Sequence, residues 1–486
     1  MADMKTLHVY IESKGESWRH VRVRELSGRE AISELFRFDV DVVCEPQHDL
    51  PEDALLGAEV SLVIEIDGDE VRRVHGILGL IQNQLDTPGD APAYRLRIVP
   101  RASRLTLVET HEVYLDRSVP DILESKVKRY VFGSGELDLR LIEAYSPREF
   151  VVQVGESDLA FLCRLAEHVG ISFYFEHEDG HDRLVFTDNP SGFLPLPGAA
   201  EVPFQRGGET TGVFALRLTT ELTPTSYMVH DYNYRRPELD LAACYDIESG
   251  NGGGVVDYGA HVKTAEEAEH IARVRGEERL SRQRVYEGRS GCPALSAGRK
   301  ASLVDHPRLP GPEPLLFVEV EHAATLPVFS EAEGPRKASY ANTFRAIPAG
   351  VPYRPPRRTP KPRIHGVVTG IIQPGPGGET GGVARLDAEG RYTVQIHFDT
   401  APPGEQKASH RMRMAQPFAG ASYGMHFPLR PGTEVALAFA NGDPDRPMIV
   451  GALFNAASPS PVVAGNATRH QIKSPTGAIF ELVSKS

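Results

Sequence analysis

The chain has 486 residues, of which 53 are basic and 66 acidic, so its formal net charge is −13. This length exceeds what one hydrophobic core usually serves, which predicts two to four domains, and the acidic balance argues against nucleic acid as the main partner. The 38 prolines and 45 glycines make up about 17% of the chain, against an average of about 12%, which favours a turn-rich β protein over a helical one.

The cysteine spacing, the N-terminal residues and the apolar runs argue against metal or redox motifs, a secretory signal and a membrane-spanning helix. Four cysteines stand far apart without a C-x-x-C pair, so we expect buried or free thiols in a reducing compartment rather than a metal or redox motif. The first residues, MADMKTLHVYIESKGE, show neither a basic n-region nor an apolar h-region, which predicts no secretory signal. No run approaches 18 apolar residues, so we expect no membrane anchor of the spanning kind. Export, if it occurs, would need a route without a cleaved signal.

Alternating apolar residues predict strands through the first 100 residues. Residues 5–43 alternate in this way, and the run 59–66 turns at Asp67-Gly68-Asp69 and returns over 70–79 as a hairpin. Tyr94–Pro100 is a further strand. Together these segments predict a first β-barrel or curled sheet.

Three helices are predicted after these strands. The first runs from the N-cap Ser118 to about Val131, and the second begins at the N-cap Ser157 and ends at Gly170. The third begins at Thr264, with Glu267 completing a capping box, and runs to about residue 282. Between and after the helices, strands are expected at 171–176, 183–187, 213–220, 225–233 and 315–322.

A proline-rich stretch and a second β region follow. Pro348–Pro362 encloses AGVPYRPPRRTPK, in which fixed φ angles and missing donors disfavour both helix and strand. We interpret 351–363 as a linker and its arginines as solvated. Beyond it, strands are expected at 364–372 and 392–398 and in the apolar runs Gly424–Leu429, Glu434–Phe439 and Met448–Phe454. Five or more short strands in about 95 residues fit an OB-like barrel.

Residues that could carry chemistry do not assemble into a motif. The patterns G-x-S-x-G, H-E-x-x-H and G-x-x-x-x-G-K-S/T are absent. Four residues near position 180 resemble a metal-ligand set, but they straddle an Asp-Gly turn, where polar residues are common, so we favour the turn. They are His177, His181, Asp182 and Asp188.

Three other groups have similar structural explanations. Glu156 and Asp158 lie at a helix start, where carboxylates stabilise the helix dipole. Gly252–Gly254 follows no clear strand, so we interpret it as a hairpin tip rather than a phosphate loop, and His261 and His270 as surface or capping residues. The sequence therefore predicts no catalytic, cofactor-binding or metal-ligating residues.

Two stretches resemble the VgrG proteins, the trimeric spike of the bacterial type VI secretion system. The first, YSPREFVVQVGESDLAFLCRLAEHVGISFYFEH, is similar to the family's tail-hub-like region. Its matching residues are Tyr145, Arg148, Glu149, Gln153, Glu156, Ser157, Phe161, Arg164, Leu165, Glu167, Gly170, Phe175, Glu176 and His177. The second stretch, between residues 363 and 477, resembles the family's barrel and its entry into a needle. Its matching segments are Arg391–Phe398, Arg411–Ala415, Pro428–Val435, Gly442–Pro447, Val450-Gly451 and Asn466–Gly477.

The resemblance implies a mainly β fold, a β-rich α+β chain in four regions. Residues 1–350 would form a phage tail-hub-like region of two β-barrels with a few helices, followed by the linker 351–363. Residues 364–457 would be an OB-fold barrel, and 458–486 a linker and the start of a trimeric β-helical needle. A strand-rich tail without a core of its own must be covered by other chains, which agrees with a trimer.

The implied function is a structural one, without enzymatic activity or cofactors. The trimer would cap a hexameric tail tube, contact baseplate proteins, and carry an effector or a PAAR-like tip protein through a target envelope. It would assemble in the cytoplasm and then be exported into the extracellular space or a target cell. The hub-spike of a phage or of an extracellular contractile particle is an alternative. An envelope-degrading enzyme and an OB-type ligand-binding module are further alternatives.

Two departures from the family bear on these expectations. The phage spike relative has a lysozyme domain between barrel and needle, whereas only 455–465 fills that interval here, so we expect no such enzyme. The 21 residues after that interval would reach at most about 70 Å as a straight strand, which is short for a family needle. We also expect no room for a C-terminal effector domain.

Overall fold

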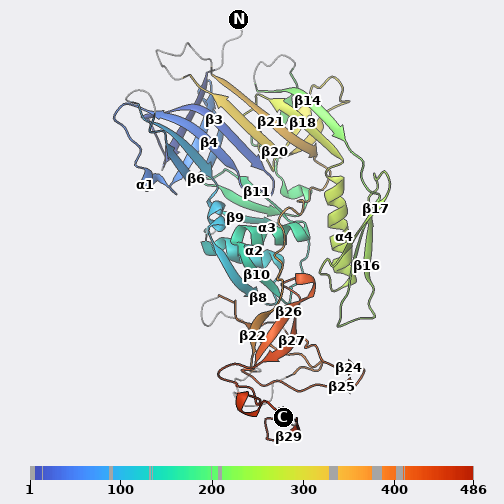
Figure 1. Cartoon of the computed structure of the whole chain (residues 1–486). Helices are drawn as coiled ribbons and strands as arrows, with labels where there is room; N and C mark the ends of the chain where they lie inside the picture. Colours follow the sequence, from blue (N-terminus) through green and yellow to red (C-terminus); the bar gives the residue numbers. More distant parts are fainter. Residues whose placement is uncertain are drawn as a thin grey trace. The chain divides into compact units, whose positions relative to one another are not determined.

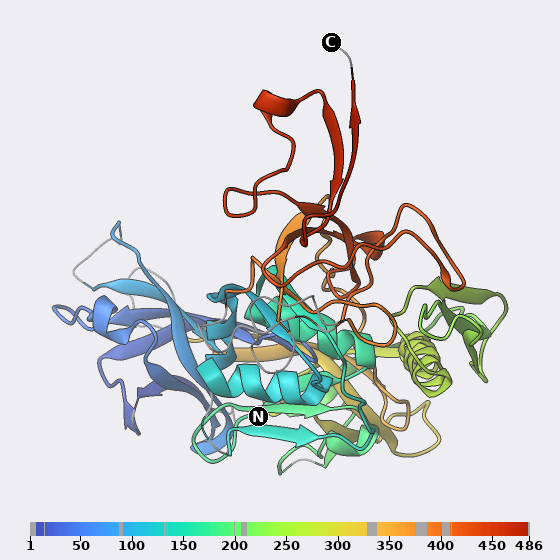
Figure 2. The same ribbon diagram turned by 90° about the horizontal axis from the view of Figure 1, so that it is seen from below.

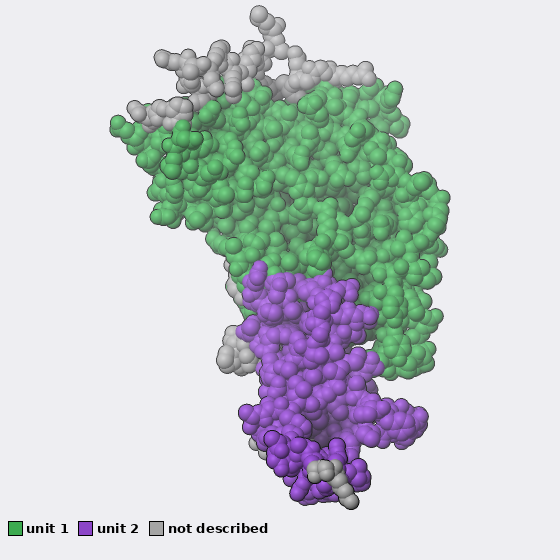
Figure 3. All heavy atoms as spheres, viewed as in Figure 1, with its two compact units in different colours: residues 1–108, 119–145, 157–360 green, residues 109–118, 146–156, 361–486 purple. Residues whose placement is uncertain are grey.

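The computed structural model describes residues 6–13, 15–86, 91–130, 133, 135–198, 200–205, 211–327, 338–374, 386–400, 409 and 411–484. The chain divides into two compact units, coloured separately in Figure 3. Unit 1 comprises 1–108, 119–145 and 157–360, and unit 2 comprises 109–118, 146–156 and 361–486. Strands dominate both, as Figure 1 shows, so the expectation of a mainly β fold with a few helices is confirmed.

Unit 1 is organised by one 13-stranded sheet, whose first half comes from the N-terminal 100 residues. In β4, Phe38, Val40 and Val42 are buried and alternate with more exposed residues, as expected for one buried face. The predicted hairpin turn is confirmed at Asp67 and Gly68, both with positive φ. The antiparallel order is β3 (Val21–Ala31), β4 (Arg37–Cys44), β7 (Ala93–Val99), β6 (Asp69–Asn83), β5 (Glu59–Ile66), β1 (Leu7–Ser13) and β2 (Glu16–Ser17).

The second half of the sheet comes from residues beyond 200 and joins the first through one strand pair. β20 (Glu313–Thr325) pairs with β3 in antiparallel register, with Glu319 opposite Ala31 and Thr325 opposite Glu25. The two halves therefore share one continuous hydrogen-bonded sheet. The remaining strands are β21 (Ser339–Pro348), β18 (Arg284–Ser290), β14 (Val213–Thr220), β19 (Lys300–Val304) and β13 (Glu201–Pro203).

Helices and two small sheets complete unit 1. The four-residue helix α1 (Glu52–Leu55) precedes β5, while α2 (Val119–Tyr130) and α3 (Asp158–Val169) pack together near β9 (Leu137–Arg140), β11 (Ser172–Glu176) and β12 (Arg183–Thr187). α4 (Ala265–Leu280) packs on a separate three-stranded sheet (Figure 1). That sheet consists of β15 (Ser226–Asp231), β16 (Leu241–Asp246) and β17 (Gly254–Tyr258).

Three of the predicted helix ends, at Ser157, Gly170 and Thr264, are confirmed by their caps. The Ser157 side chain accepts from the Ala160 N–H at 3.2 Å, and Gly170 ends α3 at a φ of 80°. At α4 the Thr264 hydroxyl accepts from the Glu267 N–H. The Glu267 carboxylate reaches the backbone N–H one residue before the cap, a small departure from the expected box. Val131, at the expected end of α2, lies outside the described residues.

Unit 2 is a small barrel-like sheet completed by two segments from the first third of the chain. Its core contains Val113, Phe150 and Val152 beside Leu437 and Ile449. Sequence reasoning did not place those three residues with the later strands. The elements are β8 (Glu109–Tyr114), β10 (Val151–Ser157), β22 (Val368–Ile372), β23 (Val394–Ile396), β24 (Ala419–Gly420), β25 (Tyr423–Gly424), β26 (Glu434–Phe439), β27 (Pro447–Leu453), β28 (Arg469–Lys473) and β29 (Ile479–Val483).

Two expectations about this region are wrong. The run Gly424–Leu429 forms no barrel strand beyond residue 424, because Pro428 cannot donate to a ladder and the Leu429 N–H instead reaches the Tyr392 hydroxyl. The proline-rich segment is not a solvated linker throughout. Arg354 is 3% exposed, and its Nε lies 2.6 Å from Glu277, so this arginine fixes the segment on unit 1.

Within the part of the chain that is described, the structure contains no helix long and apolar enough to cross a membrane.

Candidate assembly surface

The last described element of unit 2 is a hairpin that has no layer covering it. β28 and β29 pair in antiparallel register, with Ile472 opposite Phe480 and His470 opposite Leu482. Figure 2 shows the two strands side by side near the C-terminus, pointing in opposite directions and clear of the other strands of unit 2. The connecting turn is fixed locally, since the Ser474 hydroxyl accepts from the Ala478 N–H at 2.9 Å.

The two faces of this hairpin differ in character. Residues opposite one another, and residues two apart, share a face, so Ile472, Phe480 and Leu482 lie together beside His470. Those three apolar side chains are 52%, 62% and 59% exposed. The other face carries Arg469, Gln471, Lys473, Ile479, Glu481 and Val483, with an Arg469–Glu481 ion pair of 3.7 Å.

An apolar face on two strands that no further layer covers is unfavourable in water. A two-stranded hairpin by itself is marginally stable in water and needs further strands or a packing layer. Its outer backbone groups are also open to pairing with another chain. We name this apolar face, His470, Ile472, Phe480 and Leu482, the hairpin face. Its physical chemistry favours burial against other chains.

Unit 2 exposes apolar side chains at a second place. The β24–β25 ribbon and the segment after it carry Phe418, Tyr423, Met425 and Phe427, which are 45–61% exposed. The Phe418 and Tyr423 rings contact each other with centroids 5.4 Å apart. Met425 and Phe427 belong to the run Gly424–Leu429 that the sequence assigned to a barrel strand, and all four residues add to the apolar surface available to a partner.

The residues considered as metal ligands near position 180 lie in separate networks. Asp182 accepts from the backbone N–H of Arg101 at 2.8 Å and pairs with its guanidinium at 2.5 Å. Asp188 accepts from the Asn189 amide at 2.9 Å, from two backbone N–H groups and from the Tyr145 hydroxyl at 2.9 Å, and these donors hold the pKa of its carboxyl below the usual range although burial opposes them. β11 and β12 flank the turn, so the turn interpretation is confirmed.

The other weighed groups are also structural. Asp158, at the start of α3, is fully buried and pairs with Lys126 at 2.7 Å. Its role is thus more specific than helix-dipole stabilisation. Gly252 and Gly253 have positive φ and precede β17, which pairs with β15 in parallel. The glycines therefore belong to a crossover connection and not to a hairpin tip.

One cluster of possible metal ligands was missed by the sequence reasoning. His20, Glu45 and His48 place their ligand atoms within 4.8 Å of one another on the surface of unit 1. The two imidazole rings stack with centroids 4.2 Å apart and planes 13° apart, so a cation could not lie in both ring planes unless one ring turned. The spacing of 25 residues between His20 and Glu45 gave no local signal; only the β3–β4 pairing brings them together.

Two family models match the chain. The model described as "Phage tail baseplate hub (GPD)" matches residues 29–327, more than half of the chain. The model described as "Type VI secretion system/phage-baseplate injector OB domain" matches residues 380–454, which lie within unit 2.

Individual relatives agree with these models. The type VI secretion system spike proteins VgrG1c and VgrG4b of Pseudomonas aeruginosa are 29% and 31% identical over 93% and 94% of this chain. The matches cover 62% and 57% of those relatives, so this chain spans about three fifths of their length. A solved E. coli structure, described as a component of the type VI secretion system similar to the T4 tail proteins gp27 and gp5, matches at a TM-score of 0.66. It is 24% identical, and the match covers 91% of this chain and 99% of that one.

Proposed function

Since this chain belongs to the phage tail baseplate hub family, among the VgrG spike proteins, we propose that it forms the trimeric hub and spike of a type VI secretion system. Residues 1–350 would supply the hub, apart from the two segments that complete unit 2. Residues 364–457 would form the OB barrel, and 458–486 would begin the needle. In this role the chain makes and breaks no bond and acts by staying folded while it is driven into a target envelope.

The hairpin face carries this proposal. Ile472, Phe480 and Leu482 are more than half exposed on a two-stranded element without a covering layer. Three copies of the hairpin, wound together, would bury these side chains and pair the open strand edges. The trimer would thus remove both the apolar area exposed to water and the unpaired backbone groups of the edge strands. The hairpin face carries no formally charged carboxylate, lysine or arginine, whereas the other face mixes Ile479 and Val483 with two basic residues and a glutamate, so the hairpin face fits an interior better.

The partners and the location follow from the proposed role. One end of the trimer would cap a hexameric tail tube and contact baseplate proteins. The needle would carry a PAAR-like tip protein or an effector, and the hub-spike of a phage or extracellular contractile particle would use the same surfaces. Assembly in the cytoplasm would precede export. No residue of the chain is proposed as catalytic, and no cofactor is required.

The test is the solution mass of the full chain and of two matched variants, by native mass spectrometry. Leu482→Asp places a charge on the hairpin face, and Val483→Asp makes the same change on the opposite face of the same strand, which already carries charged residues. We expect a trimer for the parent and for Val483→Asp, and dissociation for Leu482→Asp. A chain ending at Leu453 should also dissociate.

The outcomes separate the parts of the proposal. A monomeric parent would contradict the trimer. A trimer in all variants would keep the spike but would place its trimer contacts outside the hairpin. Dissociation by Val483→Asp and Leu482→Asp alike would mean that the two faces are not distinguished as the structure suggests.

A further inference from the structure

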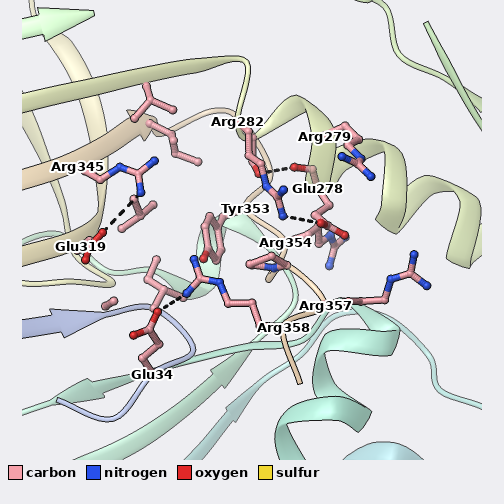
Figure 4. Close-up of a pocket in the computed structure, with 17 residues that line it drawn as sticks. Glu34, Glu278, Arg279, Arg282, Glu319, Arg345, Tyr353, Arg354, Arg357 and Arg358 are labelled. Atoms are coloured by element: carbon pink, nitrogen blue, oxygen red, sulfur yellow. Dashed lines mark hydrogen bonds and ion pairs between the residues drawn. The ribbon is translucent and has the colours of Figure 1, made fainter. Parts of the chain in front are cut away.

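Unit 1 contains a cavity of about 570 Å³ that is lined by arginines from three separate elements. Arg345 comes from β21, Arg279 from the last turn of α4, with Arg282 just beyond it, and Arg357 and Arg358 come from the proline-rich segment. Figure 4 shows these side chains around the cavity, with Tyr353 among them. The segment read from sequence as a linker is therefore one wall of a pocket.

The pocket is positively charged in a chain of net charge −13. Six arginines and three glutamates line it. Each of the three carboxylates is shared between two guanidinium groups, so the carboxylates neutralise only part of the positive charge. The sharing pairs are Glu34 with Arg29 and Arg358, Glu278 with Arg275 and Arg282, and Glu319 with Arg29 and Arg345.

Two of the lining arginines serve mainly to hold the wall in place. Arg354 is buried, pairs with Glu277 at 2.6 Å, and donates to the Gly170 and Asp188 carbonyls. Arg357 pairs with Asp257 at 2.9 Å. These contacts fix the proline-rich segment from both sides, so the pocket has a rigid wall before any ligand arrives.

Three of the four remaining arginines have N–H donors that their ion pairs do not use up. The side chains of Arg282, Arg345 and Arg358 are 48%, 51% and 62% exposed, and a guanidinium carries five N–H donors in a planar fork. Such forks bind carboxylates and phosphates with two parallel hydrogen bonds. Three forks from three elements can therefore hold more than one oxyanion group at once.

Tyr353 adds a neutral donor. Within the described part of the chain its hydroxyl has no hydrogen-bond partner, and it lies between Arg282 and Arg358 in Figure 4. Burial raises the pKa of Tyr353 to about 12, so the hydroxyl keeps its proton at neutral pH. It can then donate to an oxyanion.

The C-terminal end of α4 lies at the pocket, and its partial negative charge opposes an anion. This effect is reduced because the terminal carbonyls are already occupied. The Ser281 N–H reaches the Glu277 carbonyl at 2.9 Å, the Ser281 hydroxyl reaches the Glu278 carbonyl, and the Gln283 N–H reaches the Leu280 carbonyl. The excess of full guanidinium charges outweighs what remains.

We propose that this pocket binds a small polyanion, a molecule with two or more phosphate or carboxylate groups. Its volume lies in the range of small-molecule sites, about 300–1,000 Å³. The site belongs to unit 1 and does not depend on the hairpin. The proposed binding can therefore be tested independently of the proposed trimer.

The test is isothermal titration calorimetry on the full chain at low salt, with pyrophosphate and with citrate as probes. The variants are Arg345→Gln and Arg358→Gln. Arg95→Gln is the control, because Arg95 is also an exposed unit 1 arginine on a strand, β7, and its partner Asp41, at 2.7 Å, does not line the pocket. Thermal melting of each variant checks that it is folded.

We expect saturable binding that each pocket variant weakens by about tenfold, equivalent to about 1.4 kcal/mol, and that Arg95→Gln leaves unchanged. Tyr353→Phe should weaken binding less, and added salt should weaken it further. Binding of pyrophosphate alone would indicate a phosphate ligand and binding of citrate alone a carboxylate ligand. The proposal is overturned if neither probe binds at millimolar concentration, or if the folded pocket variants bind as the parent does.

Discussion

The buried ion pair between α2 and α3 gives the sharpest stability prediction. Lys126 Nζ lies 2.7 Å from Asp158 Oδ1, and the two side chains are 1% and 0% exposed. Replacing Asp158 by Asn removes the negative charge that lies beside a buried ammonium group. The cost is that of taking one carboxylate out of a buried ionic contact, which exceeds the cost of losing an exposed pair.

The expected magnitude can be built up from two contributions. Removing one partner of a buried pair typically costs about 3–5 kcal/mol. Asp158 is also the first residue of α3, where a carboxylate contributes about 0.3–1 kcal/mol through the helix dipole. Asp158→Asn should therefore destabilise unit 1 by about 3–6 kcal/mol. The double variant Lys126→Met, Asp158→Leu removes both charges and should be more stable than Asp158→Asn.

The assay is urea denaturation followed by circular dichroism, with hydrogen exchange to localise the change to α2 and α3. The comparison of the single variant with the double variant separates the loss of one charge of the buried pair from a general packing defect. A single variant that loses less than about 1 kcal/mol would refute the reasoning, because that is the range of an exposed pair. A double variant no more stable than the single one would also refute it.

Three further predictions follow from local features. Ser157→Ala removes the α3 cap and should cost about 1 kcal/mol in urea denaturation; an unchanged midpoint would contradict the capping role. Phe150→Ala should cost about 3–5 kcal/mol and speed hydrogen exchange in β22 and β26, because Phe150 is in the unit 2 core; a change confined to unit 1 would contradict this placement. Burial lowers the pKa of His177 from 6.5 to about 3, so the unfolded chain takes up the proton first. Stability should therefore fall as pH drops below about 6.5, by up to about 1.4 kcal/mol per pH unit, and His177→Gln should flatten this slope; equal slopes would contradict it.

Local signals in the sequence were sufficient for the elements but not for their assembly. Caps, turns and alternation depend on residues within a few positions of each other, which is why Ser157, Gly170 and the Asp67-Gly68 turn are placed correctly. The β3–β20 pairing joins residues about 290 positions apart, and no local pattern distinguishes that strand pair from any other. The resemblance to a family supplied what the local pattern could not.

The partners of buried charges also lie far away in the sequence, so local patterns could not predict them. Asp182 lies in a turn by sequence, and a turn aspartate is usually solvated. In the structure it is 1% exposed because Arg101, 81 residues earlier, supplies both a guanidinium and a backbone donor. The proline-rich segment is similar, since a row of prolines predicts no regular element but cannot show that Arg354 has a buried partner in Glu277.

The exposure of the hairpin face makes the assembly test interpretable. Leu482 is 59% exposed, so in a single chain Leu482→Asp sacrifices little buried apolar area and adds a charge to a surface in water. Units 1 and 2 have cores of their own, which do not include the hairpin. A Leu482→Asp chain should thus remain folded, with a circular dichroism spectrum close to that of the parent. Loss of the trimer in such a chain can then be assigned to the interface and not to unfolding.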